Sequence, residues 1–178
     1  EDPQIPIETT WSVRKLFEHF YSAVETPVTH NGDIYIELLL NDLIRFIGAD
    51  FSPLTIETVQ DFPVKCCVKQ SILGAYSANT YIAMDEQTAI AFASRYVKYS
   101  FNEYDEYVQA SLEDFLNLQN GLFTVNVSND SSTELTLVPP EQITDDKLSF
   151  SVSTGHIPIL YPFGELHFFI ELLQSPEA

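Results

Sequence analysis

YDEYVQASLEDFLNLQNGLF, residues 104–123, is the stretch from which the predicted fold is built. Apolar residues recur in it every three or four positions, the spacing of an amphipathic helix. They are Tyr104, Val108, Leu112, Phe115 and the run 118–122. On the polar face Glu113, Asp114 and Asn117 point the same way, because a helix turns about 100° per residue. Gly121 is expected to end the helix, and the alternating run LFTVNVS to begin a strand. The sequence thus groups two carboxylates and a carboxamide, a pattern that an ordinary solvated helix face also produces.

The segments on either side predict further helices and strands. Before residue 104, a helix is predicted over 34–47, and it stops at Gly48. Two strands are predicted over 64–73 and 75–84, with a turn at Gly74. A second helix is predicted over 85–98, with Asp85 as its N-cap. After the opening stretch, four strands are predicted over 122–128, 133–138, 147–153 and 166–173, with loops at 141–146 and 155–164. This order predicts an α/β (α+β) fold, in which a mostly antiparallel sheet packs against helices.

The N-terminal part of the chain is predicted to be an extension. Residues 11–25 have the pattern of a helix with a strong apolar face, and prolines punctuate the residues around it. We therefore divide the chain into a linker with a helical extension, 1–30, and a domain, 31–175. The chain begins at Glu1 rather than Met, as expected of a fragment or a processed product.

Composition narrows the classes of function. Asp and Glu number 26 against 8 Lys and Arg, so the formal net charge is −18. This charge repels nucleic acid and anionic membrane surfaces, and no apolar run reaches the length of about 20 residues that a membrane helix needs. The two cysteines, Cys66 and Cys67, are adjacent in a strand-like run and should face opposite sides of the sheet. They make no disulfide framework, so a reducing, cytoplasmic location is expected.

Several motifs resemble the CheC/CheX-type phosphatases of bacterial chemotaxis. The resemblance covers about residues 34–173. It rests on FIGADF at the end of the first helix of that range, on the strands before MDEQTAIAFAS, and above all on LEDFLNLQNG. The family signature is Asp or Ser, three residues, Glu, two residues, Asn, then 21 or 22 residues and Pro. Here Asn117 is followed by Pro139 after 21 residues and by Pro140 after 22. Asp114 stands where the family has Glu, and Ala110 stands where it has Asp or Ser.

The resemblance implies a reaction and roles for three residues. The substrate is a phosphorylated response-regulator receiver domain, whose phosphoaspartate holds its own Mg²⁺ and Lys; the phosphatase needs no cofactor of its own. Asn117 would position a water for in-line attack, and Asp114 or the neighbouring Glu113 would reach the Lys of the receiver. Asp114 is one methylene shorter than the Glu of the family, and the side chain of Ala110 cannot hydrogen-bond.

Two functions follow from this partial match, and they differ in class. The first is a phosphoaspartate phosphatase in chemotaxis or two-component signalling. The second is a catalytically degenerate CheX-like binding or dimerisation module, part of a longer receiver-containing protein. An unrelated α/β domain that shares only the helix pattern is a third reading. An open face at Asp114 and Asn117 favours the enzyme, whereas a covered face favours the module. A homodimer is expected if the apolar strand 166–173 lies at an uncovered sheet edge.

Overall fold

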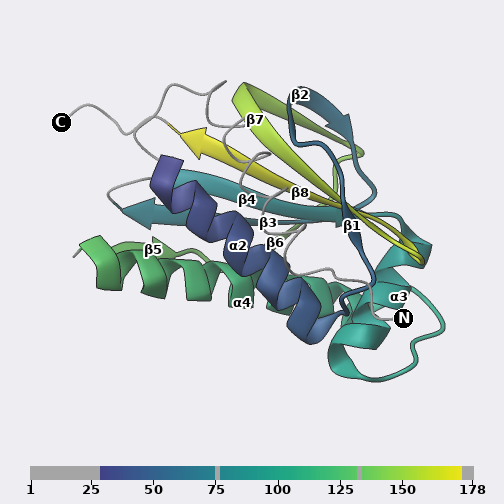
Figure 1. The fold of residues 1–178 in the computed structure, drawn as a ribbon. Helices are drawn as coiled ribbons and strands as arrows, with labels where there is room; N and C mark the ends of the chain where they lie inside the picture. Colours follow the sequence, from purple (N-terminus) through teal and green to yellow (C-terminus); the bar gives the residue numbers. More distant parts are fainter. Residues whose placement is uncertain (1–28, 75–76, 132–133, 174–178) are drawn as a thin grey trace.

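The computed structural model describes residues 29–74, 77–131 and 134–173 (Figure 1). Its helices are α2 (Thr29–Phe46), α3 (Glu86–Val97) and α4 (Glu106–Ser131). Its strands are β1 (Ser52–Pro53), β2 (Glu57–Pro63), β3 (Cys66–Gly74), β4 (Ser77–Met84), β5 (Leu135–Leu137), β6 (Glu141–Ile143), β7 (Lys147–Tyr161) and β8 (Gly164–Leu173). The helix predicted over residues 11–25 lies outside the described residues, and the division at residue 30 stays a prediction. None of the described helices is long and apolar enough to span a membrane.

The described strands form one antiparallel sheet in the order β1-β7-β8-β4-β3-β5, with β2 paired to β7 and β6 paired to β3. On one face of the sheet α2 and α4 lie side by side, and α3 packs on α4 and β8 at one end (Figure 1). The predicted fold class is therefore confirmed. The strand predicted as a possible edge, β8, lies inside the sheet between β7 and β4, so the reason for expecting a homodimer through it was wrong.

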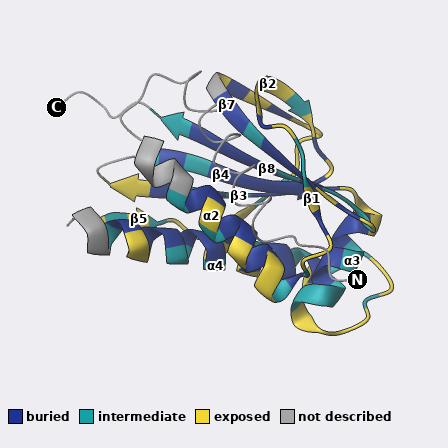
Figure 2. Cartoon of the chain, in the orientation of Figure 1, coloured by how far each residue is buried: buried dark blue, intermediate teal, exposed yellow. Residues whose placement is uncertain are grey.

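The sheet separates two apolar cores. The larger core fills the space between the sheet and the helices, and it includes Phe92, Phe115 and Phe168, each no more than 1% exposed. The smaller core lies on the other face, where Phe150 of β7 packs on Tyr81 and Phe169. In Figure 2 the inner strands of the sheet are mostly buried, whereas β2 at its side is mostly exposed. The adjacent cysteines divide between these cores, Cys66 in the larger and Cys67 in the smaller, as the strand pattern predicted.

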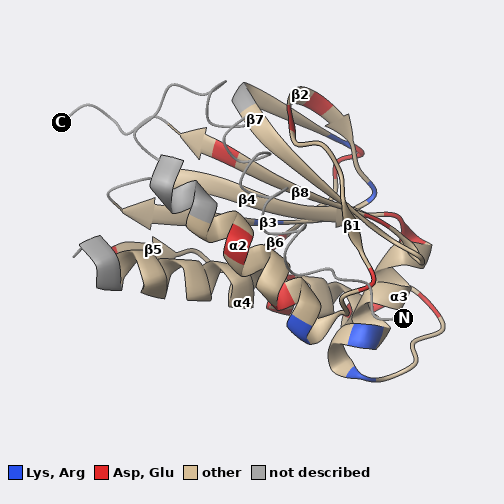
Figure 3. Cartoon of the chain, in the orientation of Figure 1, with Lys and Arg blue, Asp and Glu red and all other residues tan. Residues whose placement is uncertain are grey.

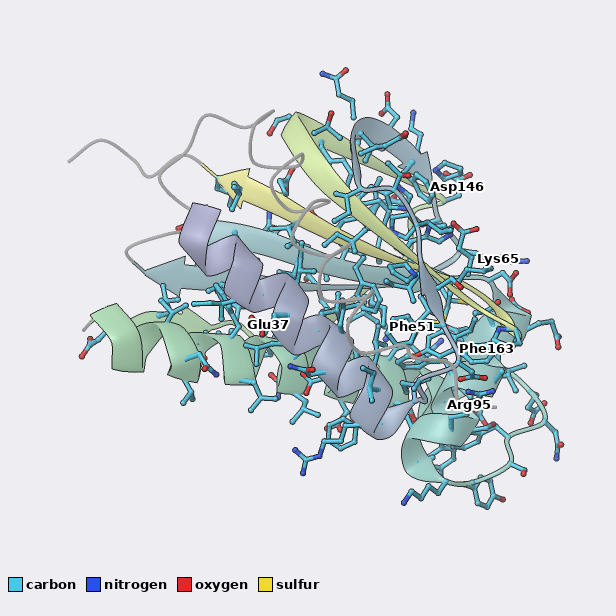
Figure 4. The ribbon with its side chains drawn as sticks, in the orientation of Figure 1. Glu37, Phe51, Lys65, Arg95, Asp146 and Phe163 are labelled. Atoms are coloured by element: carbon cyan, nitrogen blue, oxygen red, sulfur yellow. The ribbon has the colours of Figure 1, made fainter. Side chains whose placement is uncertain are left out.

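Particular residues at the ends of α2 and α3 stop these helices or fix them to the rest of the fold. Gly48 has a φ of +138° and follows the last turn of α2. The carboxylate of Asp85 accepts a hydrogen bond from the backbone nitrogen of Thr88 at 2.8 Å and caps α3. At the other end of α3, Arg95 binds Asp50 at 2.7 Å and lies over the ring of Phe163, so it ties the helix to the segment after α2 and to the β7–β8 turn (Figure 4).

Helix α4 is longer than the sequence predicted. It does not end at Gly121 but continues to Ser131, so the strand predicted over 122–128 was wrong. The alternating run LFTVNVS also has helical spacing, because Phe123 and Val127 are four residues apart and both are buried against the core. The ring of Phe123 contacts Tyr35 of α2 with centroids 5.2 Å apart. Packing against a neighbouring helix thus overrides the intrinsic strand preference of the run.

Two predicted loops are partly strand. The segment 155–164 was predicted as a loop because of its Gly and Pro residues, but β7 extends through most of it to Tyr161. Ile157, Ile159 and Tyr161 lie at every second position of the strand, and all three belong to the larger core. The range 141–146 contains β6, and the strands β1 and β2 were missed altogether. The strands β1 and β6 have only two and three residues, and the seven residues of β2 are mostly exposed, so none of them shows a clear alternation of buried and exposed side chains.

Asp42 is expected to destabilise the native protein at neutral pH. Its side chain on α2 is 4% exposed, and Oδ2 has no hydrogen-bond partner. Burial raises the pKa of Asp42 from 3.8 to about 6, although Arg45 opposes the shift. The folded state therefore binds the proton more tightly than the unfolded state, and stability falls as pH rises from about 4 to 6. Asp42→Asn should raise the free energy of unfolding at pH 7 by about 1–2 kcal/mol, since solvent screens part of the effect.

Urea unfolding of wild type and variant at pH 4 and pH 7 measures this effect, which should shrink towards the lower pH. Asp50→Asn is a matched control of opposite sign, because the hydrogen bond from Arg95 lowers the pKa of Asp50. That variant should be less stable than wild type at pH 7, and the difference should fade with acidification. A loss of stability in Asp42→Asn at pH 7 would show that the carboxylate finds a partner in solution.

Candidate functional site

The three motif positions of α4 share one exposed side of the helix. Asp105 begins the helix, since its carboxylate accepts hydrogen bonds from the backbone nitrogens of Tyr107 and Val108 at 3.0 and 3.1 Å. Buried residues then fix the rotation of α4 on the core; they are Val108, Leu112, Phe115 and Leu116. With that face packed, Ala110, Asp114 and Asn117 are all exposed. Within the described residues, the face at Asp114 and Asn117 is therefore exposed, as the phosphatase requires.

Asn117 is exposed, but its carboxamide is hydrogen-bonded to a buried side chain of the sheet. The Nε2 atom of Gln70 on β3 donates hydrogen bonds to Oδ1 of Asn117 at 2.8 Å and to the carbonyl oxygen of Val138 at 2.9 Å. Gln70 is 1% exposed, and its own Oε1 accepts a hydrogen bond from Nδ2 of Asn120 at 2.8 Å. Tyr35 of α2 completes this series of hydrogen bonds, because its hydroxyl donates to Oδ1 of Asn120 at 2.9 Å. We call the set Tyr35, Asn120, Gln70 and Asn117 the amide relay.

The orientation of Asn117 follows from its neighbours. The carbonyl of Val138 can only accept, so Gln70 must turn its NH₂ group towards it. The same NH₂ group faces Asn117, which must therefore offer its oxygen. The NH₂ group of Asn117 and the second lone pair of Oδ1 are left for a ligand or a water. A buried strand residue thus fixes which end of the exposed carboxamide is anchored.

The two candidate carboxylates differ in their surroundings. Asp114 is exposed, and its Oδ2 accepts a hydrogen bond from the hydroxyl of Tyr96 on α3 at 2.5 Å. Burial and the carboxylate of Asp114 raise the pKa of Tyr96, which keeps the phenol protonated as the donor. Glu113 is partly buried and is held towards β6, where Gln142 donates to its Oε1 at 2.7 Å. Asp114 is therefore the more accessible carboxylate beside Asn117.

The prolines at the end of the sequence motif lie close to this site. Val138, which directly precedes Pro139 and Pro140, donates its backbone N–H to the carbonyl of Ser71 and accepts from Gln70 through its own carbonyl. The segment between Asn117 and the two prolines thus contains the second half of α4 and the short strand β5. The sequence identified both ends of this segment but not Gln70, which joins them.

Gly121 is a helical glycine whose missing side chain would meet no other atom. It lies one turn after Asn117, and a Cβ added to it has no heavy atom within 4 Å. Gly121→Ala should therefore raise the free energy of unfolding by about 0.5–1 kcal/mol, since alanine is the better helix former. Urea unfolding measures the change. Gly164→Ala is the contrasting variant: Gly164 has a φ of +151°, and a Cβ there would overlap Thr88, so stability should fall. A loss of stability in Gly121→Ala would contradict the open space.

Within the described ranges, no group of three or more His, Cys, Asp or Glu side chains could hold a metal ion. The candidate site consists of amides, a carboxylate and a phenol, which can hydrogen-bond and position a reactant. It contains no nucleophile paired with a base. The residues that sequence reasoning missed, Gln70, Asn120 and Tyr96, carry no signal of their own, because each looks like an ordinary polar residue of a helix or strand.

No protein-family model and no curated protein matches the sequence. Solved structures do share its fold. The chemotaxis protein CheX from Vibrio vulnificus has a TM-score of 0.67 at 15% identity, over 78% of this chain and 96% of that one. A putative chemotaxis protein from Desulfovibrio vulgaris Hildenborough has a TM-score of 0.68 at 14% identity, over 81% and 97%. A chain of the CheX-CheY-BeF3-Mg²⁺ complex from Borrelia burgdorferi has a TM-score of 0.62 at 16% identity, over 79% and 96%. At such identities these likenesses show the fold.

Proposed function

We propose that this chain, which has the fold of CheC- and CheX-type chemotaxis proteins, is a phosphatase of phosphorylated receiver domains in chemotaxis or two-component signalling. The observation that carries the proposal is the exposed carboxamide of Asn117, which the buried Gln70 anchors beside the exposed Asp114. The similar structure from Borrelia burgdorferi is a complex of CheX with CheY. By analogy, the partner of this chain is a response regulator, and the reaction takes place in the cytoplasm.

The chemistry asks for positioning rather than covalent participation. In the proposed reaction the oxygen of a water forms a bond to phosphorus while the bond between phosphorus and the aspartyl oxygen breaks, which releases phosphate and restores the carboxylate of the receiver. The Mg²⁺ and Lys of the receiver neutralise the developing charge. Asn117 holds the water in line through its free NH₂ group and its remaining lone pair. Asp114 binds the Lys of the receiver and so fixes how the two proteins dock.

A non-catalytic binding module is the second candidate, and two observations favour it. Ala110 provides no polar group at the first motif position, and the carboxylate of Asp114 already accepts a hydrogen bond from Tyr96. A carboxylate that is shared in this way is less free to bind a lysine of a partner. In this alternative the same face of α4 binds a receiver without accelerating its dephosphorylation.

One experiment separates the two candidates. Receiver domains from the same genome are phosphorylated with a small phosphodonor, and the decay of phosphoaspartate is followed with and without the full chain. In parallel, binding to the beryllofluoride-activated receivers is measured by calorimetry. Binding with faster decay supports the phosphatase, and binding with unchanged decay supports the module. If no receiver binds and none decays faster, both candidates are wrong.

A further inference from the structure

A wide groove lies between α3 and the first half of α4, directly beside the candidate site. Its volume is about 770 Å³, and its lining includes Tyr96, Val97, Tyr99, Tyr107, Ala110 and Asp114. Most of these side chains are aromatic or aliphatic. The groove is therefore an apolar surface at the edge of a polar site.

The apolar lining is unusually open to solvent. Tyr99 is 66% exposed, Tyr107 is 64% exposed and Val97 is 44% exposed. Among the described residues, eight large hydrophobic side chains are exposed, and three of the eight gather around this one groove. Exposed apolar side chains that are clustered, rather than scattered singly, mark an interaction surface.

The groove and the candidate site share residues. Ala110 and Asp114 occupy two of the motif positions and also line the groove. Tyr96, a third lining residue, donates its hydroxyl proton to Asp114 at 2.5 Å. Ten residues separate Tyr107 from Asn117, or about 15 Å along a helix, which lies within the surface that one partner domain covers. A protein docked on Asn117 therefore also covers the groove.

The charges around the groove indicate the chemistry of the partner. Asp114 lines the groove, and the exposed Glu106 directly precedes the lining residue Tyr107. The exposed Glu103 lies two residues after Phe101, another lining residue, and Lys98 follows the last residue of α3. Figure 3 shows both signs of charge at this end of the fold. The whole chain carries a formal charge of −18. An apolar side chain flanked by Lys or Arg complements such an acidic rim, whereas an acidic surface is repelled.

We propose that this groove binds an exposed apolar side chain, flanked by Lys or Arg, that lies next to the phosphorylation site of the partner receiver. The proposal rests on the proposed function and adds how the partner is chosen. Ala110 is part of the groove wall, so its difference from the Asp or Ser of the CheC/CheX signature is a change in specificity. An aspartate at this position would place a charge in an apolar groove, one helical turn from Asp114.

Substitutions of Ala110 and Tyr107 in the full chain test the proposal. The readouts are the Kd for a beryllofluoride-activated receiver, and KM and kcat for its phosphorylated form. Ala110→Asp and Tyr107→Ser should each raise Kd and KM by about tenfold, more than they lower kcat. Val125→Ser is the matched control: Val125 is an exposed apolar residue, 57% exposed, on the same helix beyond Gly121, and its substitution should change neither constant.

The outcomes separate this proposal from the proposed function. If wild type neither binds nor acts on any receiver, the proposed function is wrong. If wild type is active and Ala110→Asp is equally or more active, the polar residue is accommodated and the groove does not bind the partner. Sedimentation velocity tests another occupant: a wild-type dimer that Tyr107→Ser dissociates would assign the groove to a second copy of this chain and overturn the proposal.

Discussion

Asn117→Ala is expected to abolish the acceleration of receiver dephosphorylation, with a fall in kcat of about 10²–10³-fold, the usual effect of removing one oriented polar group from a reaction centre. Alanine can neither hold the attacking water nor donate to the phosphoryl oxygens. Single-turnover decay of the phosphorylated receiver, at saturating concentrations of the chain, measures the effect on the chemical step directly.

The stability of this variant should hardly change, which makes it a clean test. Asn117 is exposed, and Gln70 keeps the carbonyl of Val138 as an acceptor after the substitution. The free energy of unfolding should therefore stay within about 0.5 kcal/mol of wild type. Asn117→Asp is the isosteric companion: its carboxylate can still accept from Gln70, but it repels the phosphoryl group, so activity should also be lost. Acceleration that survives in both variants would assign the chemistry to another residue.

Gln70→Leu is expected to lower both stability and kcat, although Gln70 touches no substrate in the proposed reaction. Leucine cannot accept the hydrogen bond from the NH₂ group of Asn120. It also cannot donate to the backbone carbonyl of Val138, as Gln70 does. Loss of such buried hydrogen bonds costs about 1–3 kcal/mol. It also frees Asn117 to rotate, and misplacement of about 1 Å in a positioning site can cost on the order of 10²-fold.

If Gln70 only stabilised the fold, other substitutions that destabilise the protein equally would lower kcat to the same extent. Thr80→Val is the matched control, because the hydroxyl of Thr80 accepts from Asn120 and donates to the backbone of Gln70 without touching Asn117. It should destabilise the protein to a similar degree but leave kcat nearly intact. Both variants are compared at temperatures where they are fully folded, with Kd for the activated receiver as a second readout. If kcat falls equally in both, Gln70 acts through stability and does not position Asn117.

Local chemistry explains which parts of the fold could be predicted from the sequence. Gly48 and Asp85 mark helix ends because a positive φ and an N-cap carboxylate are requirements of a few neighbouring residues. Helical spacing placed Asp114 and Asn117 on one side of α4, but it placed Glu113 there as well, and that residue is partly buried beside β6. Gly121 misled the prediction, since the same residue type that ends α2 lies within α4. Burial of Phe123 against α2 decided that outcome, and such a contact depends on the rest of the chain.

The residue that anchors Asn117, Gln70, could not be predicted from the sequence, because its role also depends on a distant contact. Gln70 lies in the apolar run VKCCVKQSIL, where a glutamine gives no sign that it faces a helix 47 positions later. Only the packing of α4 on β3 brings the two amides within 2.8 Å. The Asn-to-Pro spacing was informative because a family resemblance supplied it, whereas the residue that connects the two ends has no place in that signature.

The amide relay also has a consequence for how the site responds to acidity. Three of its four members are amides, which neither gain nor lose protons near neutrality, and the fourth is Tyr35, whose pKa is raised by burial. No proton uptake or release between mildly acidic and mildly alkaline solution can reverse the donors and acceptors that aim Asn117. The orientation of the Asn117 carboxamide should therefore stay the same over that pH range.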